Sequence, residues 1–275
     1  MPTNATFEWM RPRFFPHMWC PGCGHGIILN SMLRAFVDLK LDPTQTVIAS
    51  GIGCSSRLPG YVNACTMHTT HGRSLSYATG VKMAKPELTV IDVMGDGDCS
   101  AIGGNHFIHA CRRNIDITAV VMNNNIYGMT GGQMSPTTPK GAVAKTAPYG
   151  VYDPNFDIRK LAEGAGATFV ARTCVSNPRD VEKVISQAIQ HHGFSVVEVV
   201  GYCHTQYGRY NKLKTPVVNI NHLKSRLVPL AVAQTKTEEE LQGKIITGIF
   251  VNKNDREEYT DLYKAYAAKA EALVK

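Results

Sequence analysis

Two strand-like segments each end in polar residues that could hold a metal ion. LTVIDVMG leads into Gly-Asp-Gly around Asp96, ITAVVM leads into three asparagines around Asn124, and 25 residues lie between Gly97 and Asn123. That interval accommodates one helix, so both strand ends would lie at the ligand-binding edge of a parallel sheet. A carboxylate, an amide and a backbone carbonyl at this edge suit Mg²⁺. Gly-Asp-Gly is also an ordinary turn, but the asparagine run favours a metal site.

Four of the eight cysteines lie in glycine-rich segments. Cys20 and Cys23 belong to WCPGCGH, Cys54 to GIGCSSR and Cys203 to GYCH. A CxxC pair with two distant cysteines fits a four-cysteine site for either Zn²⁺ or a [4Fe–4S] cluster, and spacing does not separate the two. The remaining cysteines are expected to be buried core thiols: Cys65, Cys99, Cys111 and Cys174.

The elements that must position these residues follow from the apolar pattern. Strands are predicted at residues 46–50, 88–94, 117–122, 168–173 and 195–200. Helices are predicted at residues 27–39, 75–84, 105–112, 158–165 and 181–191. This alternation predicts a doubly wound α/β fold with a mostly parallel sheet. The segment 128–154, rich in Gly, Pro, Thr and Lys, is predicted to be a long functional loop.

The chain is divided at residue 203 in this interpretation. Residues 1–203 would form a ligand-binding domain that includes the cysteine loop, and residues 204–275 a C-terminal helical extension. Residues 255–274 carry an apolar stripe at helical spacing, which is expected to pack on the sheet or on a partner.

Composition excludes several classes of protein. With 275 residues, 44% hydrophobic and 19% charged, the chain is typical of folded globular proteins. No apolar run is long enough to span a membrane and the first residues lack the apolar stretch of a secretory signal, so a cytoplasmic location is expected. Eight cysteines are too dilute for a disulfide scaffold. The net charge of +7 is compatible with nucleic acid, an acidic protein or anionic cofactors.

The acid–amide pair resembles the thiamine diphosphate motif, in which GDG is followed some 25 to 30 residues later by paired asparagines. Together with WCPGCGHG, GIGCSSRLPGY, THGRSLSYATGVK and RRNIDITAVVMNNNIYGMTGGQ, it resembles the thiamine-binding β subunit of 2-oxoacid:ferredoxin oxidoreductases. The likeness covers residues 16–204, with the motifs in the same order. It implies that residues 1–203 adopt the thiamine diphosphate-binding fold.

The resemblance also implies three sets of site residues. Mg²⁺ would be held by Asp96, the Asn124 side chain and the backbone carbonyl of Ile126. A [4Fe–4S] cluster would be held by Cys20, Cys23, Cys54 and Cys203. The thiamine diphosphate pocket would include Ile52, Gly53, Cys54, Ser55, His71, Gly97, Asp98, Gly128 and Met129.

Arg57 is the best indication of the substrate. A guanidinium near the cofactor would bind a second carboxylate bidentately, which favours 2-oxoglutarate over pyruvate, branched-chain or aryl 2-oxo acids. Met129 is expected to contact the substrate as well, and Lys140 is a second candidate cation. Arg57 could instead pair with an acidic residue of a partner subunit.

Partners are expected because nearly all thiamine enzymes activate the cofactor with a glutamate from a separate pyrimidine-binding domain, for which this chain has no room. An α subunit would supply it, in an αβ heterodimer or its dimer. The resemblance implies oxidative decarboxylation of 2-oxoglutarate to succinyl-CoA, or the reverse, with coenzyme A and ferredoxin. Residues 201–237 contain six basic and no acidic residues, which suggests a surface for ferredoxin or the α subunit.

Two other classes of function remain as alternatives. One is a non-catalytic zinc protein in which the cysteines are structural. The other is a nucleic-acid-binding module, for which only Tyr202, Tyr207 and Tyr210 beside Arg209 give weak support.

Overall fold

The computed structural model describes residues 4–274, so residues 1–3 and 275 at the ends of the two predicted segments lie outside it. The described chain builds one eight-stranded sheet with the order β2-β1-β3-β4-β6-β5-β8-β7. β1 to β6 run parallel, whereas β8 runs antiparallel to β5. The strands are β1 Thr46–Ser50, β2 Cys65–His68, β3 Thr89–Gly95, β4 Thr118–Asn123, β5 Phe169–Cys174, β6 Ser195–Val200, β7 Leu227–Pro229 and β8 Ile245–Asn252.

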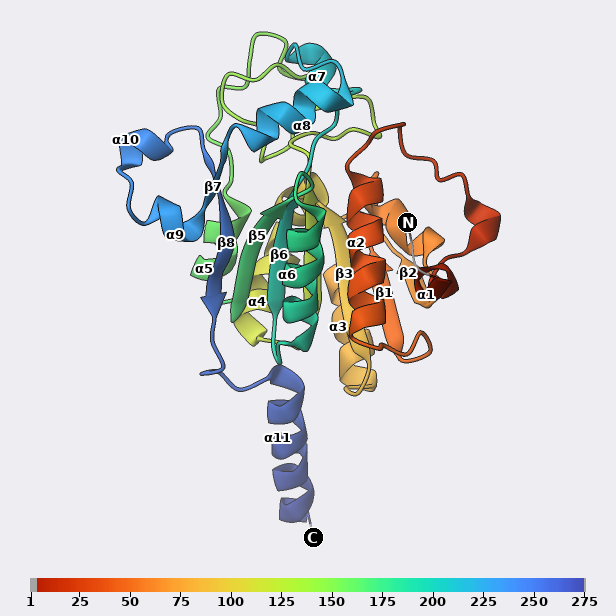
Figure 1. Ribbon diagram of the computed structural model, residues 1–275. Helices are drawn as coiled ribbons and strands as arrows, with labels where there is room; N and C mark the ends of the chain where they lie inside the picture. Colours follow the sequence, from red (N-terminus) through yellow and green to blue (C-terminus); the bar gives the residue numbers. More distant parts are fainter. Residues whose placement is uncertain (1–3, 275) are drawn as a thin grey trace.

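Helices cover both faces of the sheet (Figure 1). α2 and α6 pack on one face, against side chains such as Ile48, Ile91 and Val120. α3, α4 and α5 pack on the other, against Val47 and Val90. Because alternate strand residues meet a helix layer on each side, the strands are apolar almost throughout. The predicted doubly wound α/β fold is therefore confirmed. The helices are α1 Asn4–Glu8, α2 His25–Asp38, α3 Ser74–Ala84, α4 Gly104–Arg113, α5 Ile158–Gly164, α6 Pro178–Gln190, α7 Tyr207–Tyr210, α8 Pro216–Lys224, α9 Leu230–Ala233, α10 Glu238–Leu241 and α11 Tyr259–Val274, with the short turns η1 Pro12–Phe14, η2 Ser55–Tyr61 and η3 Asp98–Ile102.

The C-terminal region adds strands as well as helices. β8 pairs with β5 across a bulge, and β7 pairs with β8, so the region after residue 203 extends the sheet. Sequence analysis predicted only helix here and missed both strands. The extension is therefore joined to the first 203 residues by backbone hydrogen bonds.

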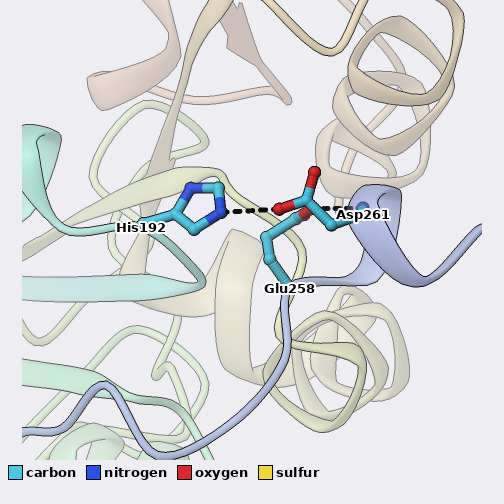
Figure 2. Close-up of side chains that lie close together, drawn as sticks. All are labelled: His192, Glu258 and Asp261. Atoms are coloured by element: carbon cyan, nitrogen blue, oxygen red, sulfur yellow. Dashed lines mark hydrogen bonds and ion pairs between the residues drawn. The ribbon is translucent and has the colours of Figure 1, made fainter. Parts of the chain in front are cut away.

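Figure 2 shows side chains that hold the first turn of α11 to the body of the protein. Glu258 caps the helix: its carboxylate accepts hydrogen bonds from the backbone N–H of Thr260 at 2.7 Å and of Asp261 at 3.0 Å. His192 Nε2 lies 2.9 Å from Asp261 Oδ2 and adds a side-chain hydrogen bond. Beyond this turn the helix projects from the body (Figure 1), at the end of the molecule opposite α7 and α8.

The apolar stripe on α11 does not pack on the sheet. Tyr259 lies against the core, but Tyr263, Tyr266 and Leu273 are exposed. The expectation that this stripe packs on the sheet is thus wrong beyond the first turn of the helix. The reason is that α11 points away from the sheet, so its later turns have no sheet surface to contact. Packing on a partner stays a prediction.

Residues 124–157 form a long loop that contains the predicted loop 128–154. Ile126, Ala144 and Val151 of this loop form a small apolar core together with Cys203. Within residues 4–274, no helix combines the length and the apolar character that crossing a membrane requires.

Candidate cofactor and cluster site

A cavity opens at the carboxyl ends of β1, β3 and β4, the edge at which parallel sheets bind ligands. The loops after these strands supply most of its wall, and α2 adds its first residue, His25. All nine predicted thiamine contacts and all three predicted Mg²⁺ ligands line this one cavity. Its lining is His25, Ile52, Gly53, Cys54, Ser55, His71, Gly95, Asp96, Gly97, Asp98, Met122, Asn124, Ile126, Tyr127, Gly128, Met129 and Thr130.

Asp96 is held at the base of the cavity by two hydroxyls. Its Oδ2 accepts hydrogen bonds from Ser135 Oγ at 2.5 Å and Thr137 Oγ1 at 2.6 Å. Burial raises the pKa of Asp96, and the hydrogen bonds from Ser135 and Thr137 oppose that rise. The carboxylate is therefore fixed in orientation by one oxygen.

Asn124 and Ile126 lie beside this carboxylate. The backbone N–H of Asn124 donates to Asp96, and the Asn124 side-chain oxygen accepts the N–H of Ile126 at 3.2 Å. All three residues are buried. A carboxylate, an amide oxygen and a backbone carbonyl are hard oxygen donors, so the donor set fits Mg²⁺.

A buried polar chain leads from this group across the sheet. Thr137 Oγ1 also lies 3.2 Å from Asn123 Oδ1, and Asn123 Nδ2 donates to Glu198 Oε1 at 2.8 Å. Arg172 completes the chain, with Nε 2.7 Å from Glu198 Oε2 and Nη2 2.5 Å from Asp157 Oδ1. Burial alone would raise the pKa of Asp157, but the guanidinium of Arg172 holds it below its usual range.

Asp98 and His71 form a second polar pair in the cavity wall. Asp98 Oδ1 contacts His71 Nδ1 and accepts the backbone N–H of Gly72 at 2.7 Å and of Ile52 at 3.3 Å. Burial raises the pKa of Asp98, and the Gly72 N–H and His71 oppose it. Its Oδ2 is buried with no hydrogen-bond partner among the described residues. A Cβ at Gly51 would lie only 2.2 Å from that oxygen, so only glycine admits this approach.

The four predicted cluster cysteines converge beside the same cavity. A Cβ at Gly128 would lie 3.3 Å from Cys203 Sγ and 3.7 Å from Cys54 Sγ, which places both sulfurs next to the cavity wall. Thr205 Oγ1 lies 3.7 Å from Cys20 Sγ and 3.5 Å from Cys203 Sγ. Gly128 therefore lies close to Cys54 and Cys203, and Thr205 lies close to Cys20 and Cys203.

Cys23 completes the group. Burial raises the pKa of its thiol to about 12, and the charges of the three other cysteines add to the rise. The backbone N–H of His25 opposes it, and His25 Nδ1 lies 3.1 Å from Cys23 Sγ. Burial likewise raises the pKa of Cys54 to about 11, with Cys203 and Cys20 contributing. Four mutually interacting thiols would ionise readily only around a metal.

The four cysteine sulfurs do not form a closed metal cage on their own. In the part of the chain that the structure describes, only His192, Glu258 and Asp261 bring three His, Cys, Asp or Glu ligand atoms within 4.8 Å of one another. Four thiolates are suitable ligands for Zn²⁺ and for a [4Fe–4S] cluster alike.

The predicted core cysteines and the two candidate substrate-binding cations lie outside this cavity. Cys99, Cys111 and Cys174 are buried as expected, but Cys65 is exposed on β2, so its prediction as a core thiol is wrong because β2 is an edge strand. Arg57 and Lys140 are both exposed and are not part of the cavity lining. Burial lowers the pKa of His68, and the charge of Arg57 lowers it further.

Sequence reasoning missed several residues of the site. Ser135 and Thr137 hold Asp96, and Tyr127 donates its hydroxyl to the carbonyl of Gly97 at 3.1 Å. The sequence pattern assigns no role to His25, although it lines the cavity and contacts Cys23. Its position two residues after the CxxC pair is the signal that could have identified it.

Comparisons with known proteins agree with this geometry. Residues 48–199 match the family model "Thiamine pyrophosphate enzyme, C-terminal TPP binding domain". The 2-oxoglutarate synthase subunit KorB of Methanocaldococcus jannaschii is 49% identical over 95% of this chain and 97% of its own length. The protein of the same name from Archaeoglobus fulgidus is 56% identical over 79% of each chain.

A solved structure extends the likeness to the whole chain. It is a 2-oxoglutarate:ferredoxin oxidoreductase from Magnetococcus marinus with 2-oxoglutarate, coenzyme A and succinyl-CoA bound. It is 32% identical, with a TM-score of 0.84, and the match covers 100% of this chain and 97% of that one. With the cavity, the acid–amide pair and the four cysteines in place, the chain belongs to the thiamine pyrophosphate-binding β subunits of the 2-oxoglutarate:ferredoxin oxidoreductases, the KorB family.

Proposed function

We propose that this chain works with an α subunit in the coenzyme A-dependent oxidative decarboxylation of 2-oxoglutarate to succinyl-CoA, or in the reverse reaction. The observation that carries the proposal is a shared wall. Cys54 and Gly128 line the cavity that holds the acid–amide pair, and the sulfurs of Cys54 and Cys203 lie directly behind Gly128. The proposed cofactor cavity, where the substrate would be oxidised, therefore lies next to the cysteines that would bind the electron acceptor.

In this proposal, Asp96, Asn124 and the carbonyl of Ile126 hold Mg²⁺, which would bind the diphosphate of the cofactor. When bound, thiamine diphosphate supplies the nucleophilic carbon and accepts the electron pair released as CO₂ leaves. The chain's own residues bind and orient. Ile52 and Met129 give partly exposed apolar walls, which would exclude water once a partner covers them.

The four cysteines would hold a [4Fe–4S] cluster in the proposed enzyme. Such a cluster accepts electrons one at a time, which zinc cannot do. Met129 links the two sites, because its side chain lines the cavity and its backbone N–H donates to Cys54. The cluster would pass electrons to ferredoxin.

The substrate and the partners are part of the proposal. 2-Oxoglutarate and coenzyme A are bound in the Magnetococcus marinus structure, and the KorB name denotes one subunit of an assembly. Arg57 is exposed and follows the cavity residue Ser55 by two positions, so we propose that it binds the second carboxylate of 2-oxoglutarate in a site completed by the α subunit. Residues 1–203 would bind the cofactors, residues 204–275 would contact the α subunit or ferredoxin, and the eight free cysteines suit the reducing cytoplasm.

The test is turnover by the co-purified αβ complex. With coenzyme A and a viologen dye, 2-oxoglutarate should be oxidised at least tenfold faster than pyruvate, branched-chain or aryl 2-oxo acids, and the complex should contain iron. Preference for another 2-oxo acid would assign the same chemistry to that substrate, whereas a colourless zinc-loaded complex would overturn the redox role. The isolated chain should not decarboxylate, and activity without the α subunit would contradict the division of the site.

A further inference from the structure

His25 lies between the two parts of the site. It is the first residue of α2 and is 3% exposed, yet its side chain lines the cavity. On the side of the cysteines, its Nδ1 lies 3.1 Å from Sγ of Cys23. One buried ring therefore touches both the cofactor cavity and a cluster ligand.

In a chain that holds the cluster, only one of these two atoms can donate the hydrogen bond. A cysteine that ligates a cluster is a thiolate and has no proton to donate. The hydrogen must therefore be on Nδ1 of His25, which donates it to the sulfur. The backbone N–H of His25 donates to the same thiol.

The other ligands differ from Cys23 in their donors. Cys54 receives backbone N–H groups, and Cys20 and Cys203 share the neutral hydroxyl of Thr205 at 3.7 and 3.5 Å. Among the described contacts, Cys23 is the one cluster cysteine with an imidazole donor. Hydrogen bonds to ligand sulfur stabilise the more negatively charged reduced cluster and raise its reduction potential.

The ring is also held in place. Trp19 packs against His25 with ring centroids 5.8 Å apart, and its Nε1 donates to the carbonyl of Cys54 at 2.7 Å. The donor is therefore oriented by its surroundings and does not need the cluster to place it.

We propose that His25 is a positioning residue that raises the reduction potential of the cluster through its hydrogen bond to Cys23. The proposal rests on the proposed function, since it requires the cluster. Its removal should reduce the equilibrium constant for one-electron reduction about tenfold, which corresponds to a shift of 59 mV to more negative potential.

The experiment is a reductive titration of the co-purified αβ complex, followed by the EPR signal of the cluster. His25→Leu removes the donor, and His25→Asn keeps an N–H near the position of Nδ1. We expect the leucine variant to shift to more negative potential and the asparagine variant to recover at least half of the shift. His204→Leu is the matched control, because His204 also follows a cluster cysteine but contacts the ring of Tyr202.

Equal potentials in wild type and His25→Leu would overturn the role of His25 while leaving the proposed function intact. Absence of any cluster signal in wild type would overturn the proposed function itself. If the leucine variant does not retain its cluster, pulsed EPR of the wild-type complex with ring-¹⁵N-labelled histidine decides. A histidine nitrogen coupling that the asparagine variant lacks supports the hydrogen bond, and a wild-type spectrum without it excludes the bond.

Discussion

Ser135 Oγ lies 2.5 Å from Oδ2 of Asp96, although the two residues are 39 positions apart in the chain. This contact closes the long loop after β4 over the end of β3. It gives the proposed metal ligand a fixed orientation before any metal binds.

Removing this support should weaken metal binding without removing the ligand. Ser135→Ala combined with Thr137→Val leaves Asp96 buried but removes both hydroxyl donors from its Oδ2. We expect the affinity for Mg²⁺ and thiamine diphosphate to fall about 10-fold to 100-fold. Calorimetric titration of the αβ complex measures it, with Ser186→Ala, whose hydroxyl bonds only within α6, as the control. Unchanged affinity would show that the hydroxyls do not orient Asp96.

Gly128 should be required for the cluster. A methyl group there would lie 3.3 Å from Cys203 Sγ, a contact tighter than most Cβ atoms make, so Gly128→Ala should displace the sulfur. We expect the variant to lose at least half of its iron during anaerobic purification. Gly80→Ala is the matched control, since a Cβ there meets nothing within 4 Å. Full iron content in Gly128→Ala would contradict the crowding.

Arg172 should stabilise the sheet centre. Arg172→Leu leaves Glu198 buried without its ion-pair partner, so we expect the free energy of unfolding at pH 7 to fall by about 3–5 kcal/mol. Urea denaturation measures it, and Arg34→Leu, an exposed arginine that bonds within α2, should change it by about 0.5 kcal/mol or less. A similar change for both variants would contradict this assignment.

The second ion pair of Arg172, with Asp157, predicts a pH dependence. Arg172 lowers the folded-state pKa of Asp157 below its ordinary value, so this carboxylate stabilises the fold at and above neutral pH. The contribution is lost as the pH falls through the lowered pKa. The stability difference between wild type and Arg172→Leu should therefore shrink between pH 5 and about pH 3, as measured by urea denaturation across that range. A difference independent of pH would exclude the ion pair as its cause.

Arg57 should select for a second carboxylate. We expect Arg57→Leu to reduce kcat/KM for 2-oxoglutarate by about 100-fold or more, while turnover of an uncharged 2-oxo acid changes little. Lys140→Leu, which removes another exposed cation, serves for comparison. Equal losses on both substrates would show that Arg57 acts through the α subunit instead.

The basic stretch 201–237 should contact ferredoxin. Lys212→Glu with Lys214→Glu reverses two charges beside α7 and α8, so the apparent KM for ferredoxin should rise about tenfold at low salt, with kcat for a viologen dye unchanged. Gel filtration of the doubly substituted complex supplies the second readout. Loss of the α subunit there would assign these lysines to the subunit interface.

The buried parts of the fold were predictable, and the edges were not. β1 and β6 are buried on both faces and match the predicted runs residue for residue. β2 is short and partly exposed, so it has no apolar run to recognise. β8 has an apolar sequence, but Gly248 interrupts it and the pairing passes from Val251 to Ile249 across a bulge.

The site divides in the same way. Asp96 and Asn124 follow strands, so sheet topology alone brings them together. Ser135 and Thr137 reach Asp96 from a loop whose path no local pattern encodes. The only sequence feature that pointed to a role for His25 is its position two residues after the predicted cluster ligand Cys23.

The polar chain from Asp96 through Thr137, Asn123 and Glu198 to Arg172 crosses three adjacent strands. A ligand that binds only the folded chain stabilises it by mass action. Because this chain connects the proposed metal-binding carboxylate with β4, β6 and β5, ligand binding and the stability of the sheet centre are coupled. Such a coupling is reciprocal, so a ligand that binds at Asp96 would also help to hold these three strands together.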